Sequence, residues 1–523
     1  MSFEVINPKT IRDFLDIGTQ YGSQIEKRRF PLTRILSMIE ASEHKCKTIL
    51  VENDYEDDEY VAEYDMFYKQ VFFCDPKAKC KKLHFFSSMF TKDEFEKAQD
   101  KTLQESAKSY LGYCTIRPEP YKTISDALVS QKLAIDSATR FVFFTCLAHK
   151  KFKLCNVELE VCGFPYLQQD GRIAVCAQAA LSIISQYFFL NKKIEKAYSA
   201  PAVTQTVSRS PNAQGQRHLP SNGLNIIQIR LAMEEMGFNP MAYDFSLTRQ
   251  EELMLTVHPE QIIYRFIESG IPVIIGINTA SQGHALVVVG HTFNPDYWWS
   301  QVETLYYGIP KSGPYHLSTN WIQNFIVQDD NLGPYLFVPS SILRGNTTNC
   351  IIAPLSKLVF NAGDEAEKIA FDAISQDVMR EMMKTHCKVK AKDFPLNVYW
   401  LGAMIVAMEN QQLVLRTYLS KKDDFLDSLS PDTNKEVMAC YKAMELPDSL
   451  WVVELSTPPI FCYARLKLGE VLIDPTSDPR FDTCFLSIHV PGIIFERNKS
   501  KGLIYKEIST EDPPSKHLYR HLK

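Results

Sequence analysis

Residues 170–184 read DGRIAVCAQAALSII, where an Asp-Gly turn signal leads into an unbroken run of small and apolar residues at helical spacing. Cys176 opens that run. On the first turn of a helix, unpaired backbone N–H groups and the positive end of the dipole favour the thiolate, which is the nucleophilic form of cysteine. The stretch therefore predicts a helix that begins at a reactive cysteine. The competing interpretation is an inert core cysteine, since most buried cysteines are inert.

Three later segments read as strands. Residues 271–278 (IPVIIGIN) and 283–291 (GHALVVVGH) are nearly continuous apolar runs, which is typical of buried strands, and the second carries His284 at its mouth. Residues 325–335 (FIVQDDNLGPY) form a strand pattern whose end carries Asp329 before an Asn-to-Pro turn. A cysteine, a histidine and an acid thus follow one another in chain order, each at the end of an element.

This set has the composition that nucleophilic catalysis by cysteine needs. A thiol needs a base within hydrogen-bond reach, and the base needs a third group that fixes its tautomer. Donors must also be aimed at the oxyanion. The Cys176 backbone N–H and the side-chain amide of Gln168 or Gln169 are candidates for those donors.

The quoted segments resemble the papain-like cysteine peptidases, most closely the branch that processes bacteriocin leaders. The family's order is glutamine, cysteine, histidine, then Asn or Asp, and the resemblance covers roughly residues 163–340. It implies that Cys176 is the nucleophile, that His284 is the general acid/base and that Asp329 orients the histidine. It also implies a helix bearing the cysteine packed on an antiparallel sheet that bears the histidine and the acid.

The sequence departs from the family near the oxyanion glutamine. The family places that glutamine six positions before the cysteine, where this chain has Asp170. Gln169 and Gln168 lie seven and eight positions before it, so both stay open as the donor. The residue after the cysteine is Ala177, where the family often has Gly or Trp, and the insertion between the histidine and the acid is long.

Several nearby residues have simpler interpretations. We expect His291, at the far end of its strand, to be structural. Asp329 and Asp330 could both be turn acids beside Asn331; we expect one of them to be, and the register favours Asp329 as the partner of the histidine. Asp474, before a proline late in the chain, also reads as a turn residue. Cys74, Cys80 and His84 fit no zinc spacing, so we predict no metal site and no cofactor.

Composition sets the broader class. The 523 residues are 45% hydrophobic and 23% charged, the net charge is -5, and the 13 cysteines follow no framework spacing. Together with the lack of a signal-peptide pattern and of a long apolar segment, this predicts a cytoplasmic protein with free thiols. We expect no membrane and no nucleic-acid partner; the oligomeric state is left open.

We predict an α+β protein with three domains. These are an N-terminal α+β domain (1–162), a papain-like domain (163–349) and a C-terminal α+β domain (350–523). In the first, the acidic run 52–65 reads as a solvated loop, and 141–146 pairs with 157–161 across a basic turn at 148–153.

The function that these patterns predict is hydrolysis of a peptide or isopeptide bond in a protein or peptide substrate, through an acyl-enzyme on Cys176. Two alternatives stay open. One is a catalytically inactive papain-like binding or scaffold protein, and the other is a thiol acyltransferase that uses the same thiol–imidazole chemistry.

Overall fold

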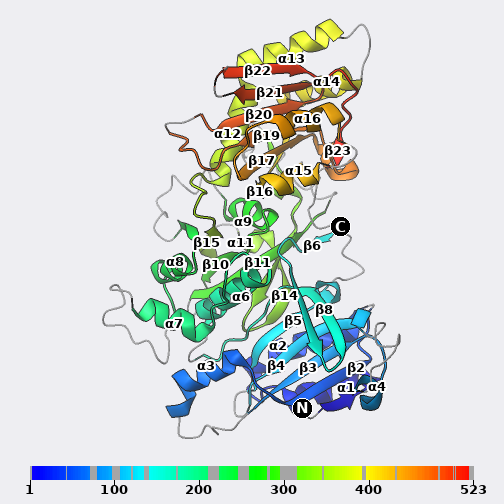
Figure 1. Ribbon diagram of the computed structural model, residues 1–523, viewed down its shortest axis with the longest axis vertical. Coiled ribbons are helices and arrows are strands. Elements are labelled where there is room, and N and C mark those ends of the chain that lie inside the picture. Colours follow the sequence, from blue (N-terminus) through cyan, green and yellow to red (C-terminus); the bar gives the residue numbers. More distant parts are fainter. Residues whose placement is uncertain are drawn as a thin grey trace. The chain divides into compact units, whose positions relative to one another are not determined.

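A computed structural model describes most of the chain, and Figure 1 shows its helices and strands. Helices and several antiparallel sheets are mixed, as the predicted α+β class requires. Among the described helices, none is long and apolar enough to cross a bilayer. The described residues are 3–42, 44–70, 79–96, 107–118, 122–134, 141–171, 175–209, 223–245, 258–278, 283–294, 315–343, 347–390, 396–429, 433–480, 483–498, 500 and 502–516.

The chain divides into two compact units, each built from separate segments. Unit 1 comprises Met1–Arg249, Pro272–His291 and Phe325–Pro354, and unit 2 comprises Gln250–Ile271, Thr292–Asn324 and Leu355–Lys523. The expected boundary at 349/350 lies close to the last switch between units, whereas the expected boundary at 162/163 falls inside unit 1. The three-domain division stays a prediction.

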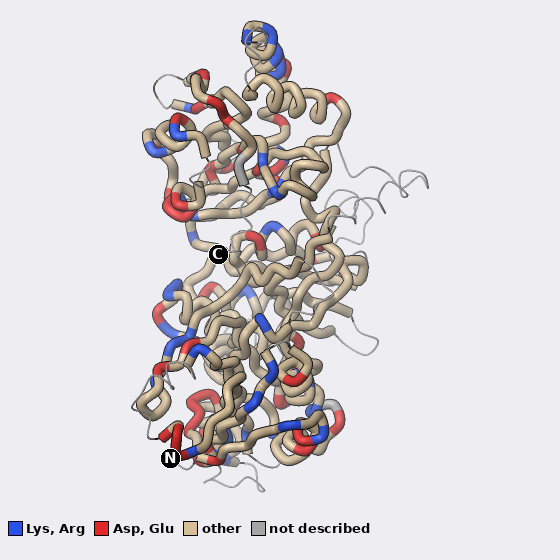
Figure 2. Tube along the Cα trace, turned by 90° about the vertical axis from the view of Figure 1, so that its right-hand side faces the viewer, with Lys and Arg blue, Asp and Glu red and all other residues tan. Residues whose placement is uncertain are grey.

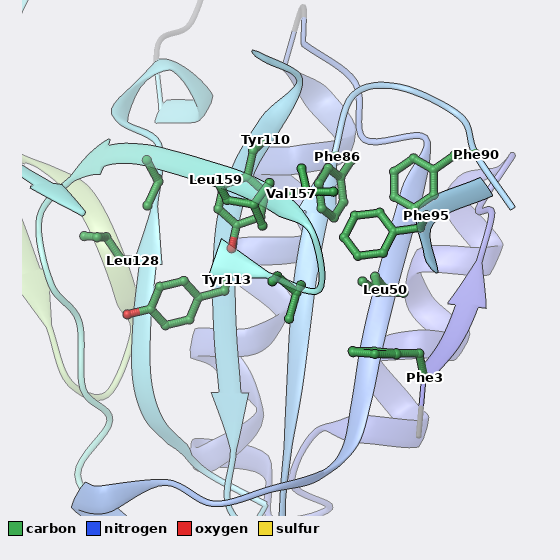
Figure 3. Close-up of a cluster of buried hydrophobic side chains, with 12 residues drawn as sticks. Phe3, Leu50, Phe86, Phe90, Phe95, Tyr110, Tyr113, Leu128, Val157 and Leu159 are labelled. Carbon is green, nitrogen blue, oxygen red and sulfur yellow. The ribbon is translucent and has the colours of Figure 1, made fainter. Parts of the chain in front are cut away.

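Unit 1 contains a five-stranded antiparallel sheet whose strands follow chain order. Aromatic side chains fill the space over one face: the rings of Phe86 and Phe90 meet edge to face at 4.9 Å, and Phe90 stacks on Phe95 at 5.2 Å (Figure 3). Leu159 and Val157 of a separate hairpin cover the same cluster. Burial of this aromatic surface holds hairpin and sheet together. The strands are β1 (Phe3–Ile6), β2 (Thr48–Tyr55), β3 (Cys80–Phe86), β4 (Tyr110–Ile116) and β5 (Ile124–Val129), and the helices near them in sequence are α1 (Ile11–Tyr21), α2 (Glu26–Ala41), α3 (Asp58–Met66) and α4 (Lys92–Glu96).

The covering hairpin corrects one expectation. Residues 148–153 are not a turn but belong to strand β7 (Ala148–Leu154), which pairs with β8 (Val157–Gly163). His149, Lys151 and Lys153 form the exposed face of the strand, where Lys151 lies opposite Glu160, whereas Lys150 lies on the other face and donates to the Tyr113 hydroxyl at 2.6 Å. The turn lies at Cys155, which has a positive φ of 52°. Alternation of lysine with apolar residues, rather than charge density, was the informative pattern.

The acidic run 52–65 corrects another. It is not a solvated loop: β2 continues to Tyr55, and Asp57 caps helix α3 by accepting the Tyr60 N–H at 3.1 Å. Glu59 and Glu63 of that helix are buried. Buried carboxylates need partners from elsewhere in the chain, which the run itself could not disclose.

The second sheet of unit 1 contains the strands that the apolar runs predicted. Its order is β14-β13-β11-β10-β15-β9, with β6 also paired to β11. Strand β11 is antiparallel to both β10 and β13. Helices α6, α7 and α8, which lie between β8 and β9 in the sequence, pack against one another. The strands are β6 (Val142–Phe143), β9 (Asn239–Asp244), β10 (Val273–Asn278), β11 (Gly283–Thr292), β13 (Asn324–Asp329), β14 (Gly333–Pro339) and β15 (Thr348–Leu355), and the helices are α6 (Cys176–Leu190), α7 (Ala200–Ser208), α8 (Ile226–Glu235) and α11 (Ser340–Leu343).

Unit 2 is built on a seven-stranded sheet in the order β12-β16-β17-β19-β20-β21-β22. All its pairs are antiparallel except the short β12–β16 pair. The strands are β12 (His316–Leu317), β16 (Val414–Lys421), β17 (Ser449–Ser456), β19 (Gly469–Ile473), β20 (Phe485–Val490), β21 (Ile493–Asn498) and β22 (Gly502–Glu507), with β18 (Leu466–Lys467) paired to β23 (Ser515–Lys516). The helices are α9 (Pro259–Glu268), α12 (Gly363–Ser375), α13 (Asp377–Lys390), α14 (Leu396–Glu409), α15 (Lys422–Ser428) and α16 (Lys435–Ala443).

Acidic and basic residues are interspersed along the trace (Figure 2). In unit 2, seven buried charged side chains alternate in sign from one to the next, so each anion has a cation beside it; they come from α9, from strands β16 to β20 and from the segment after β22. Alternation matters because a buried charge is tolerated only when it is paired. The consecutive members are Glu268, Arg416, Glu454, Lys467, Glu470, His489 and Asp512.

His489 links the last two anions of this chain of charges. Its Nδ1 lies 3.0 Å from Glu470 and its Nε2 2.8 Å from Asp512. Burial lowers the pKa of His489, but the two carboxylates outweigh burial and raise the pKa to about 10. The Tyr441 hydroxyl and Lys467 also contact Glu470. The imidazole is therefore positively charged at neutral pH.

We expect His489→Gln to lower the free energy of unfolding by about 3–5 kcal/mol at pH 7, because two buried carboxylates lose their cation. The pKa is higher in the folded state, so the contribution is fully present below pH 6.5 and is lost as pH rises through about 10. Urea titrations followed by tryptophan fluorescence report on unit 2, since all five tryptophans fall in its sequence ranges.

The matched control is His316→Gln, since His316 contacts a neutral amide, that of Gln412, at 3.2 Å. It should change stability by less than about 1.5 kcal/mol. A His489→Gln deficit that is equal at pH 7 and above pH 10 would contradict the ionic origin of the effect.

Candidate functional site

Cys176 is the first residue of helix α6, and its side chain is partly exposed while the body of the helix is buried. Val175 precedes it in extended conformation and makes no side-chain cap. The first backbone N–H groups therefore have no side chain of the N-cap residue bonded to them, which favours a negative charge at this end. The preceding residues 172–174 lie outside the described part of the chain.

His284 lies near the start of β11, opposite Ile277 of β10. Its Nε2 lies 3.2 Å from Asp329 Oδ1 and 3.5 Å from Asp330 Oδ1. The Cys176 thiol interacts with the same ring and raises its pKa. Because Nε2 faces the acids, Nδ1 is the nitrogen left for the thiol. The structure thus brings together all three residues of the expected catalytic set.

Asp329 ends β13, and its Oδ1 accepts three hydrogen bonds. Besides His284, it takes the backbone N–H of Asn331 at 2.8 Å and that of Leu332 at 3.1 Å. The Asp329 carbonyl accepts the hydroxyl of buried Tyr166 at 3.1 Å. The turn that follows the strand thus fixes the carboxylate, and the carboxylate fixes the ring plane of the histidine.

The electrostatics of the histidine follow from these contacts. Burial lowers the pKa of His284, but hydrogen bonds with Asp329 and Cys176, together with the charges of Asp330 and Asp329, raise it to about 10. The ring is therefore an imidazolium at neutral pH.

Asp330 is buried, and both its carboxyl oxygens lack a hydrogen-bond partner. Burial raises its pKa to about 7; the charge of His284 opposes the rise and that of Asp329 adds to it. The sequence placed Asp330 beside Asp329 as a possible turn acid, but it gave no sign that both carboxylates are buried beside His284. With His284 and Asp329 it forms the group of ligand-type side chains in the described residues that could hold a metal ion.

The two glutamines have different surroundings. Gln168 is buried, its amide N–H donates to the Arg28 carbonyl at 2.9 Å, and its Oε1 accepts the Ile124 N–H at 3.1 Å. Both polar groups of its side chain are therefore bonded within the fold. Gln169 is partly exposed, and its amide donates to Asn331 Oδ1. Asn331 thereby joins the turn after β13, which carries Asp329 and Asp330 (the acid turn), to the loop that carries Gln168 and Gln169 (the glutamine loop). The sequence around Asn331 did not indicate this role.

A buried polar cluster holds the glutamine loop from the N-terminal side. Asp170 is fully buried and accepts the hydroxyl of Tyr68. Arg117 pairs with Glu63 of α3, with Nε 2.7 Å from Oε2, and also donates to the carbonyl of Gln168 at 3.3 Å. These residues were missed by sequence reasoning, since their meeting depends on contacts across more than fifty positions.

The other singled-out residues make different contacts. His291 is buried on β11, with its ring 5.4 Å from that of Phe143. Asp474, in unit 2, accepts the Thr476 N–H at 2.8 Å as a turn acid. His84 of β3 is bonded to Glu52 and Tyr110, and Cys74 lies outside the described residues.

Comparisons with known proteins found a distant structural match. No protein-family model matches the chain, and no curated protein matches it. Among solved structures, it is similar to the peptidase domain of Streptococcus ComA, a bi-functional ABC transporter involved in a quorum-sensing pathway. The identity is 13% and the TM-score 0.20, over 36% of this chain and 96% of that one. At that TM-score the likeness carries no argument about function, and the functional assignment rests on side-chain geometry alone.

The cluster around Arg117 predicts a stability effect. Arg117→Met leaves Glu63 buried and unpaired, so we expect a loss of about 3–5 kcal/mol in unit 1. The double variant Arg117→Met/Glu63→Met should recover much of that loss, because both charges are then gone. Hydrogen–deuterium exchange of residues 157–171 measures the effect, with β17 in unit 2 as an internal reference.

A double variant as unstable as the single one would contradict the ionic account. Equal exchange of residues 157–171 in Arg117→Met and the unmodified chain would contradict the claim that this cluster holds the glutamine loop.

Proposed function

We propose that this protein is a cysteine peptidase that cleaves a peptide or isopeptide bond through an acyl-enzyme on Cys176. The observation that carries the proposal is the contact of one imidazole with both a thiol at a helix N-terminus and a fixed carboxylate. The substrate class, a protein or peptide, and the cytoplasmic location stay predictions.

In the proposed reaction, the Cys176 thiolate attacks the carbonyl carbon and forms a tetrahedral oxyanion. As the C–N bond breaks, the His284 imidazolium gives its proton to the leaving nitrogen, and a thioester remains. The neutral imidazole then takes a proton from water, which attacks the thioester and releases the acid and the thiol. Asp329 keeps Nε2 engaged throughout, so that Nδ1 handles the proton.

We assign the oxyanion donors to the backbone N–H of Cys176 and the side-chain amide of Gln169. An amide nitrogen has two N–H donors, and the bond to Asn331 uses one and leaves the other for the substrate. Gln168 is a poorer candidate, since its amide already serves the Arg28 carbonyl and the Ile124 N–H.

The first test is labelling with iodoacetamide at neutral pH. A thiolate paired with an imidazolium reacts faster than an ordinary thiol, whose pKa is about 8.5. We expect the fastest-labelled cysteine to be Cys176, and Cys176→Ala to abolish the fast phase. Cys155→Ala is the matched control, because Cys155 is exposed and lies in a turn. It should leave the fast phase unchanged.

Peptide mapping identifies the alkylated residue. A fast phase that survives Cys176→Ala would overturn the assignment of the nucleophile. Fast labelling without hydrolysis of any peptide library would favour the binding-protein or acyltransferase alternatives, which an added amine acceptor separates.

The second test isolates the oxyanion site. A peptide aldehyde forms a tetrahedral thiohemiacetal whose oxygen occupies the oxyanion position, whereas alkylation by iodoacetamide creates no oxyanion. Removal of one oxyanion donor costs about 10²–10³ in catalysis. We therefore expect Gln169→Ala to weaken aldehyde binding at least tenfold while the rate of alkylation changes less than twofold.

Gln168→Ala serves as the comparison, since we expect it to lower stability by about 1–3 kcal/mol through unpaired backbone groups. Equal weakening of aldehyde binding and alkylation by Gln169→Ala would point to general disruption and overturn the oxyanion assignment.

A further inference from the structure

The side of His284 that faces away from the thiol has an unusual feature: two buried carboxylates converge on one ring nitrogen. Asp329 Oδ1 is 3.2 Å and Asp330 Oδ1 3.5 Å from Nε2. The Asp329 oxygen is held by two backbone N–H groups, whereas neither oxygen of Asp330 has a hydrogen-bond partner. A single acid suffices to orient a catalytic histidine, so the second buried acid needs another explanation.

The separations fit a metal ion. First-row metals bind imidazole nitrogen and carboxylate oxygen at about 2.0–2.2 Å, which places neighbouring ligand atoms roughly 3–3.5 Å apart. The Nε2-to-oxygen distances lie in that range, and the ligand atoms of all three residues lie within 4.8 Å of one another. Two carboxylates would balance the charge of a divalent ion, which would also satisfy the unpaired oxygens of Asp330.

We infer that Nε2 of His284 and the carboxylates of Asp329 and Asp330 bind one divalent first-row transition metal ion, and that this ion reversibly switches the thiol site off. Mixed imidazole and carboxylate ligands suit such ions as Mn²⁺, Fe²⁺, Co²⁺ and Zn²⁺. The backbone N–H groups that hold Asp329 would orient the metal-bound carboxylate. The regulatory half of the inference rests on the proposed peptidase function, but the binding half does not.

The inhibition follows from the two ring nitrogens. A nitrogen that binds a metal carries no proton, so binding at Nε2 releases its proton to solvent and breaks the hydrogen bond to Asp329. The metal also engages the carboxylate that holds the ring in place, so the contact between the ring and the thiol loses its support. Alkylation of the thiol is then slowed, although the metal does not touch it.

This arrangement differs from direct capture of a thiolate by a soft metal. Direct capture requires Cys176 as a ligand and would be lost in Cys176→Ala. The inferred site lies behind the histidine and should survive that change. The two cases therefore separate cleanly by mutation and by spectroscopy.

The binding experiment uses the full chain, treated with a chelator and titrated with Co²⁺ in competition with a chromophoric chelator. We expect one equivalent to bind to the unmodified chain and to Cys176→Ala with affinities within twofold. The spectrum should show cobalt d–d bands without a thiolate-to-cobalt charge-transfer band. Asp330→Asn and His284→Ala should each weaken binding at least tenfold.

The matched control is Asp57→Asn, which makes the same change at another buried aspartate of unit 1. It should bind Co²⁺ like the unmodified chain. Circular dichroism checks the folding of each variant, and the spectrum of the unmodified chain decides the ligand type even if Asp330→Asn misfolds. A charge-transfer band lost in Cys176→Ala, unchanged binding by a folded Asp330→Asn, or no binding at millimolar Co²⁺ would each overturn the site.

The regulatory arm measures alkylation of Cys176 with and without Co²⁺. We expect at least tenfold slower labelling with the metal, full recovery with chelator, and at least tenfold lower metal sensitivity in Asp330→Asn. Binding without any effect on Cys176 would overturn the switch and keep the site. If Cys176 labels no faster than Cys155 even without metal, the peptidase proposal fails, whereas the cobalt titration still decides the site.

Discussion

The candidate site depends on a single oxygen, Oδ1 of Asp329. Two backbone N–H groups of the turn after β13 hold it, and it in turn bonds Nε2 of His284. Since the strand end fixes the carboxylate and the carboxylate bonds Nε2, Nδ1 is the nitrogen left for Cys176. The antiparallel pairing of β11 with β13 brings the two residues together across 45 positions of sequence. The geometry of the candidate site is a consequence of sheet register and one turn.

Residues of the N-terminal part of the chain hold the loops of the candidate site. Arg34 of α2 donates to the carbonyls of Pro334 and Tyr335 at 3.1 and 2.7 Å, just after the acid turn. Arg117 and Tyr68 hold the glutamine loop on the other side. The acid turn and the glutamine loop are thus both bonded to residues of the predicted N-terminal domain (1–162). These bonds fit the placement of residues 1–249 in one compact unit.

The sequence predicted best where local pattern and burial agree. Apolar runs identified β10, β11 and β13, and small residues after a turn identified α6, so Cys176, His284 and Asp329 could all be named. Pattern failed where burial depends on a distant partner. Glu63 reads as solvated until Arg117 covers it, and Asp330 reads as a turn acid until its surroundings are known. Charge density alone does not tell a solvated side chain from a paired one.

Three histidines that contact carboxylates show which property distinguishes a candidate base from a structural residue. His489 and His284 both have a pKa raised to about 10 by carboxylates, so the pKa does not separate them. His489 gives each nitrogen to a different acid, and His84 gives one to Glu52 and one to Tyr110. Of these three, His284 alone has two acids at the same nitrogen. The other nitrogen is then available to exchange a proton with the thiol. A general acid/base needs such an available nitrogen, and a charged ring alone does not provide it.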